Sequence, residues 1–99
     1  MDIKELANRI YDLDQMVYSS LGSALGHVFN RNRERAVSEM VALMQDANGE
    51  HALRSRLALI SNMARTIPDK ELHKQAMTEY DHILKDLRDI PDGIGNLPV

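Results

Sequence analysis

Apolar residues recur along this chain three and four positions apart, which is the spacing of an α-helix, up to about residue 90. In the first stretch they form one continuous stripe when successive residues are turned by about 100°. This stripe predicts a helix over residues 2–29. The segment 19–23 is rich in serine and glycine, which are poor helix formers, so we expect a bend or a break there. The stripe consists of Ile3, Leu6, Ala7, Ile10, Leu13, Val17, Leu21, Ala24, Leu25 and Val28.

Three further stripes predict helices over about 33–47, 51–66 and 69–90. We expect Gly49 to end the second of the four helices in a left-handed conformation, the usual role of glycine there. Pro68 marks the next boundary, because the residue before a proline is pushed out of helical geometry. The residues expected to face inward are Ala36, Val37, Met40, Val41, Met44, Ala47, Leu53, Leu57, Ile60, Met63, Ala64, Leu72, Ala76, Tyr80, Ile83, Leu84, Leu87 and Ile90, with Leu59 at the edge.

Four amphipathic helices joined by short connectors are typical of an all-α fold, here an up-and-down antiparallel bundle. We expect a single helical domain over residues 1–90. The segment 91–99 has no helical period and contains two of the three prolines, so we expect it to be a flexible tail.

Composition narrows the classes of protein to which the chain can belong. With no cysteine, it cannot be a disulfide scaffold, a thiol enzyme or a cysteine-bound metal protein. The N-terminal residues do not resemble a signal peptide, and no apolar run is long enough for a transmembrane helix, so we expect a cytoplasmic protein with no membrane contact. Only four of the 99 residues are aromatic, and this thin core favours a stabilising partner, either another protein or a second copy in a homodimer.

Three polar side chains fall within apolar stripes: Asp14, Arg56 and His73. An unpaired charge in a core is costly. One interpretation places all three at the rim, where their charged ends reach water. A second interpretation pairs Asp14 with Arg56 inside the bundle, with His73 capped by a backbone carbonyl or joining them. A third assigns them to a partner interface.

Candidate chemistry is sparse. Glu79-x-x-His82 matches half of a di-iron carboxylate signature, which requires a second such pair and further inward glutamates that the chain lacks. Gly22 and Ser23 do not have the spacing of a nucleophile elbow or of a phosphate loop. We therefore expect a protein that is not an enzyme and needs neither a metal nor a cofactor.

Charge is distributed unevenly along the chain. Residues 1–30 and 66–99 have net charges of −2 and −3, whereas residues 31–65 have a net charge of +2 and contain six arginines. Arg31, Arg33 and Arg35 alternate at the predicted corner before the second helix. Arg54 and Arg65 lie on the outer face of the third helix, and these five residues are the predicted partner-binding set. The alternative interpretation is that Arg31, Arg33 and Arg35 are ordinary solvated surface residues of a corner and bind no partner.

Together these features favour a small helical protein that acts by binding and modulates a larger protein or complex. Chains of this kind are common among phage and mobile-element accessory genes, which is a base rate rather than a property of these residues. The alternative is a DNA- or RNA-associated regulator that uses the arginine-rich middle segment. Against it stand the net charge of −3 and the absence of aromatic residues among those arginines.

Met16 projects from the polar side of its helix, apart from the apolar stripe.

Overall fold

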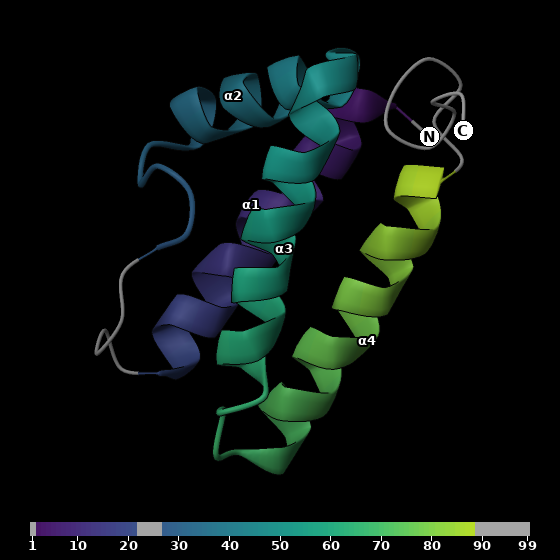
Figure 1. Cartoon of the computed structure of the whole chain (residues 1–99). Helices are drawn as coiled ribbons and strands as arrows, with labels where there is room; N and C mark the ends of the chain where they lie inside the picture. Colours follow the sequence, from purple (N-terminus) through teal and green to yellow (C-terminus); the bar gives the residue numbers. More distant parts are fainter. Residues whose placement is uncertain (1, 22–26, 89–99) are drawn as a thin grey trace.

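The computed structural model describes residues 2–21 and 27–88. Within these residues the fold is all-helical, as predicted, with four α-helices and one short 3-10 turn. The elements are α1 (Ile3–Ser20), α2 (Arg33–Gln45), η1 (Ala47–Gly49), α3 (Glu50–Ala64) and α4 (Lys70–Arg88). Figure 1 shows α1, α3 and α4 running lengthwise beside one another, with α2 across one end.

Short polar side chains begin three of the helices. Asp2 accepts a hydrogen bond from the backbone N–H of Lys4 before α1, and Asn32 accepts one from Arg35 before α2. Asp69 does the same for Leu72 at the start of α4. Each carboxylate or amide oxygen satisfies a backbone donor that has no partner within the first turn of its helix. These caps explain why the helices begin close to their predicted positions.

The first helix is shorter than predicted. It ends at Ser20, and the N–H of its cap residue Leu21 bonds back to Val17 and Tyr18. The break therefore falls inside the predicted segment 19–23, but the predicted continuation to residue 29 is wrong, since residues 27–32 are not helical. Residues 22–26, which include Ala24 and Leu25, lie outside the described part of the chain, as does the predicted tail 91–99.

Gly49 differs from its prediction as well. It begins α3 with φ −84° and ψ −13°, in the right-handed region, so it does not end α2 in a left-handed conformation. A Cβ atom at this position would lie 2.5 Å from the backbone oxygen of Leu43 and 2.8 Å from its Cα. Glycine is required here because η1 brings the chain against the backbone of α2.

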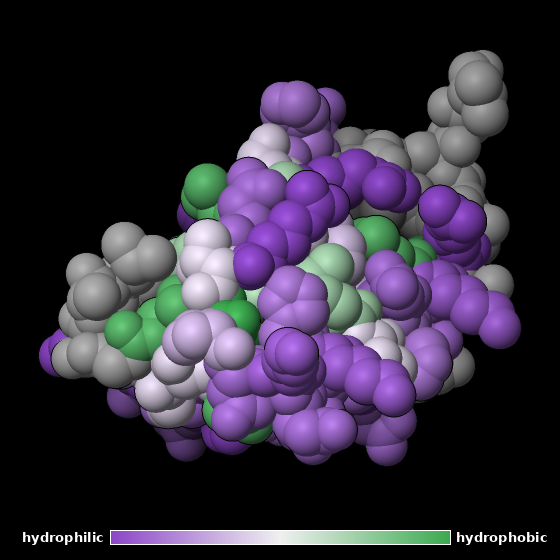
Figure 2. Space-filling view, turned by 90° about the horizontal axis from the view of Figure 1, so that it is seen from below, coloured by the Kyte–Doolittle hydropathy of each residue, from purple (hydrophilic) through white to green (hydrophobic). Residues whose placement is uncertain are grey.

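The helical stripes meet in a core in which many side chains have no exposed area. Most of the residues predicted to face inward are buried. The ones that are only half-buried are Ile3, Leu21, Val28, Val41, Met63, Leu72, Tyr80 and Leu84. Leu59, predicted at the edge, is 54% exposed. Figure 2 shows one end of the molecule covered mainly by hydrophilic side chains, with apolar side chains reaching the surface in small separate areas. The buried apolar residues are Leu6, Ala7, Ile10, Tyr11, Leu13, Val17, Phe29, Ala36, Val37, Met40, Met44, Leu53, Leu57, Ile60, Ala64, Ile67, Ala76, Ile83 and Leu87.

Candidate partner-binding surface

Asp14 is completely buried in the middle of α1. Its carboxylate accepts hydrogen bonds from the backbone N–H groups of Val28 (3.1 Å) and Phe29 (3.0 Å). These donors belong to the non-helical segment that follows α1, and packing this segment against α1 removes their N–H groups from water. A buried N–H needs an acceptor, and Asp14 provides one for two consecutive residues.

The predicted pair between Asp14 and Arg56 is replaced by separate contacts. Arg56 pairs with Glu39 of α2, and its guanidinium carbon lies 5.3 Å from the centre of the Phe29 ring. Both residues therefore contact the segment 27–32, Asp14 through its backbone and Arg56 through its aromatic ring. His73 is half-buried near the start of α4, and among the described residues no hydrogen bond or ion pair joins it to Asp14 or Arg56.

The segment 27–33 is fastened to α1 at several further points. The hydroxyl of Tyr11 donates to the backbone oxygen of Arg31 at 2.7 Å. The guanidinium of Arg33 donates to Asn8 (3.0 Å) and Asp12 (2.5 Å) and lies over the Tyr11 ring at 4.4 Å. The guanidinium uses its planar donors for these hydrogen bonds and one face for the ring contact. It is therefore held in one orientation. Residues 27–33, which form the described part of the corner between α1 and α2, therefore have a defined shape.

His27 and Tyr18 extend this attachment toward the end of α1. Their rings are stacked with centroids 3.9 Å apart, and His27 Nε2 lies 2.8 Å from the Gln15 side-chain oxygen. The other ring nitrogen, Nδ1, is buried and has no hydrogen-bond partner among the described residues. These contacts position the ring against α1 through its face and one nitrogen.

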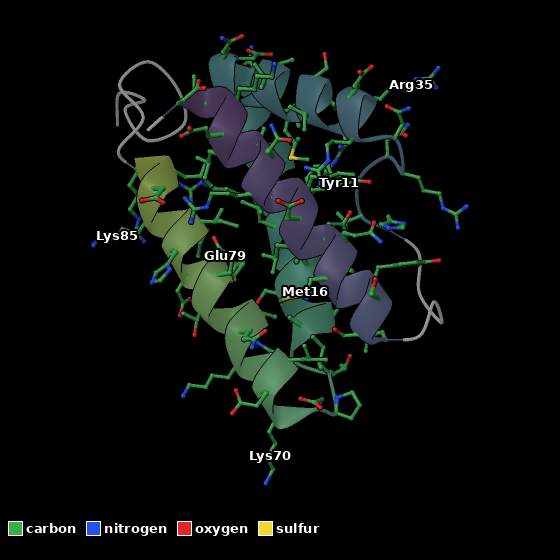
Figure 3. All side chains as sticks on the ribbon, turned by 180° about the vertical axis from the view of Figure 1, so that it is seen from behind. Tyr11, Met16, Arg35, Lys70, Glu79 and Lys85 are labelled. Atoms are coloured by element: carbon green, nitrogen blue, oxygen red, sulfur yellow. The ribbon has the colours of Figure 1, made fainter. Side chains whose placement is uncertain are left out.

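The five predicted partner-binding arginines do not form one surface. Arg31, Arg33 and Arg35 are all exposed at the α1–α2 corner, and Figure 3 shows Arg35 pointing away from the molecule. Arg54 and Arg65 are exposed on α3, but at about 100° per residue they lie on the opposite side of this helix from Arg56, which contacts the corner. The structure therefore separates them from the corner arginines.

A hollow of about 530 Å³ lies beside this corner, between α1 and α2. Its polar lining includes the donors Lys4, Asn8 and Arg33, and Val37 and Val41 supply an apolar part. Most of these donors come from α1 and one from the first turn of α2. The corner thus combines the fixed guanidinium of Arg33 with a concave, partly apolar surface. Ser38 and Glu34 complete the lining.

The helical pattern of the sequence did not assign a role to Arg9. Arg9 donates to Glu79 (2.6 and 3.1 Å) and to Asp86 (2.6 Å), and so joins α1 to α4. The hydrogen bond to Asp86 raises the pKa of the Arg9 guanidinium above its ordinary value, burial opposes this, and Glu79 adds to the rise. Glu79 and Asp86 stand seven positions apart at the edge of the α4 stripe, so they lie on the same side of the helix. This spacing is the one feature of the sequence that indicates a contact between these carboxylates and another helix.

Glu79 therefore takes part in an ion pair, while His82 is exposed. Residues 2–21 and 27–88 contain no group of three or more histidine or acidic side chains placed to hold a metal ion. Nor does any helix in this part of the chain combine the length and the apolar character needed to cross a membrane.

Comparisons with known proteins add nothing to this picture. No protein-family model matches the chain, and neither the curated proteins nor the solved structures gave a match.

Proposed function

We propose that this protein acts by binding, as a non-enzymatic adaptor or modulator of a larger protein, and that the α1–α2 corner is its binding surface. The observation that carries the proposal is the attachment of Arg33 to Asn8, Asp12 and the Tyr11 ring. A side chain held in this way loses less conformational freedom on binding than a mobile surface arginine. Arg31 and Arg35 stand on either side of it and are exposed.

The partner expected at this corner is an acidic protein surface. Arg31 and Arg35 offer planar donors suited to carboxylates, and the neighbouring hollow accepts an apolar side chain against Val37 and Val41. Arginine is enriched among the residues that dominate binding energy at protein interfaces. An ordered corner with both features favours protein recognition over a solvated turn.

Nucleic acid remains the second candidate because phosphates bind to the same donors. The corner also contains Glu34, and Asp12 lies 2.5 Å from Arg33. The negative charge of these carboxylates disfavours phosphate binding at the neighbouring arginines. The Tyr11 ring is already covered by Arg33, which leaves it unsuited to stacking on a base. These features favour a protein partner.

The test compares which proteins three versions of the full chain capture from a cell lysate. The three versions are the native protein, Arg31→Ala/Arg35→Ala, and the control Lys70→Ala/Lys85→Ala. Both double variants remove two exposed cations, and Figure 3 shows Lys70 and Lys85 on α4, away from Arg35. Arg33 is retained because it also holds the corner together. We expect one protein that the native chain captures to be captured at least about tenfold less by Arg31→Ala/Arg35→Ala. The control should capture the same amount of it as the native chain.

Equal capture by the two double variants would contradict the proposal. A parallel measurement uses random-sequence duplex DNA and the native protein over a range of salt concentrations. Binding that falls steeply with salt and depends on Arg31 and Arg35 would replace the protein partner by nucleic acid.

A further inference from the structure

A second surface lies along the seam between α1 and α4. Glu5, Arg9, Asp12 and Met16 are spaced four, three and four residues apart, so they form one row along α1. A matching row on α4 consists of Glu71, Gln75, Glu79, His82 and Asp86. The bonds from Arg9 to Glu79 and Asp86 show that these rows face each other.

The seam is strongly acidic. Its two rows contain five carboxylates and one guanidinium. They come from the first and last helices, which belong to the two parts of the chain with a negative net charge, and the fold places α1 and α4 side by side. Asp12 and Glu79 remain open to solvent, with side chains 61% and 40% exposed. A carboxylate has about four acceptor positions, so both can accept donors beyond those of Arg33 and Arg9.

The seam is also hollowed. A groove of about 330 Å³ is lined by Arg9, Asp12, Leu13, Met16, Gln75 and Glu79. Leu13 and Met16 give it an apolar wall, and Figure 3 shows Met16 and Glu79 on the facing sides of α1 and α4. The place of Met16 in this groove accounts for a methionine outside the apolar stripe of its helix. Methionine is adaptable and is common at surfaces that repack around a partner.

We propose that this groove binds a basic segment of a protein partner, in which one apolar side chain is flanked by lysine or arginine. The apolar side chain packs against Leu13 and Met16. The flanking cations reach Asp12 and Glu79, whose exposed oxygens give the rim its negative charge. The chemistry is opposite in sign to that of the corner, and the proposal does not depend on the corner's function.

The probes are a synthetic peptide of alternating leucine and lysine and its counterpart with glutamate in place of lysine. The readout is the NMR signal of the Met16 methyl group in the full chain, assigned with Met16→Leu. We expect the Leu–Lys peptide to shift this signal in a saturable way and the Leu–Glu peptide to leave it in place. Arg31→Ala/Arg35→Ala should bind the Leu–Lys peptide as the native chain does.

A matched pair of substitutions tests the location. Gln75→Lys puts a cation into the groove without removing any ion pair that holds α1 to α4, and Gln45→Lys makes the same change on an exposed position of α2. We expect the first to weaken binding of the Leu–Lys peptide by about tenfold and the second to leave it unchanged. Met16→Ser lacks the reporting methyl group, so its binding is followed by titration calorimetry, and we expect it to be weaker by about fivefold or more.

Three results would overturn the proposal. The first is a Met16 signal unmoved by saturating Leu–Lys peptide, and the second is equal binding by the two glutamine variants. The third is a Met16 signal that moves with protein concentration alone, because the occupant of the groove would then be a second copy of this chain.

Discussion

At the scale of single residues, Asp14 shows how much one buried carboxylate can organise. It takes two backbone donors from a segment fourteen and fifteen positions further along the chain. Without this acceptor, the N–H groups of Val28 and Phe29 would be turned toward the apolar face of α1. The position of the α1–α2 corner, and of the arginines on it, therefore depends on a residue that has no exposed area.

We expect Asp14→Ala to lower the free energy of unfolding by about 2–4 kcal/mol, because one buried and one part-buried donor lose a charged acceptor. Urea denaturation measures this change, and hydrogen exchange at the Val28 and Phe29 amides should become faster. Glu5→Ala is the control, since it removes an exposed carboxylate from the same helix, and it should stay within about 0.5 kcal/mol of the native chain. Unchanged protection of the two amides in Asp14→Ala would contradict this account.

At the scale of elements, the connection between α2 and α3 depends on a close approach of backbones. The N–H of Gly49 bonds to the backbone oxygen of Asp46 at 2.9 Å, and the side chain of Asp46 accepts from the N–H of Asn48 at the same distance. These bonds tighten the turn until Gly49 lies against Leu43. The requirement for glycine is therefore steric and does not come from a positive φ.

We expect Gly49→Ala to destabilise the protein by about 1–3 kcal/mol, since the new methyl group meets backbone atoms that cannot move without shifting a helix. Asn48→Ala at the neighbouring exposed position should change stability by no more than about 0.5 kcal/mol. Thermal or urea unfolding of both variants checks the difference. A Gly49→Ala protein as stable as Asn48→Ala would show that the turn relaxes freely.

At the scale of the whole molecule, the described core is closed within one chain. Twelve of its apolar residues are 0% exposed, and α1 contacts each of the other three helices. The low aromatic content suggested that a second copy completes the core, but leucine, isoleucine and methionine fill it instead. The structure of one chain does not test the predicted homodimer, but a core closed within one chain favours a folded monomer.

We therefore expect the midpoint of thermal unfolding to stay constant over about a hundredfold range of protein concentration, as it does when the folded unit is a monomer. Differential scanning calorimetry at several concentrations is the measurement, with light scattering to record the mass in solution. A midpoint that rises with concentration would show that folding and self-association are linked.

The sequence by itself determined the helices and their inward faces, because helical periodicity is local: Leu53, Leu57 and Ile60 show their common face through their spacing alone. It also determined that Asp14 stands in an apolar stripe and that arginines gather near the corner. Asp14 is indeed buried, and Arg31, Arg33 and Arg35 are together and exposed.

Only the tertiary structure decided which groups meet. Arg9 and Asp86 are 77 positions apart, and Arg56 and Glu39 are 17 apart, so no local pattern could assign these pairs. It also decided that the chain leaves α1 at Ser20 and returns to give Asp14 backbone partners, and that the two acidic ends form one seam. The physical reason is that a charged or buried polar group takes the nearest suitable partner in space, and packing sets that distance.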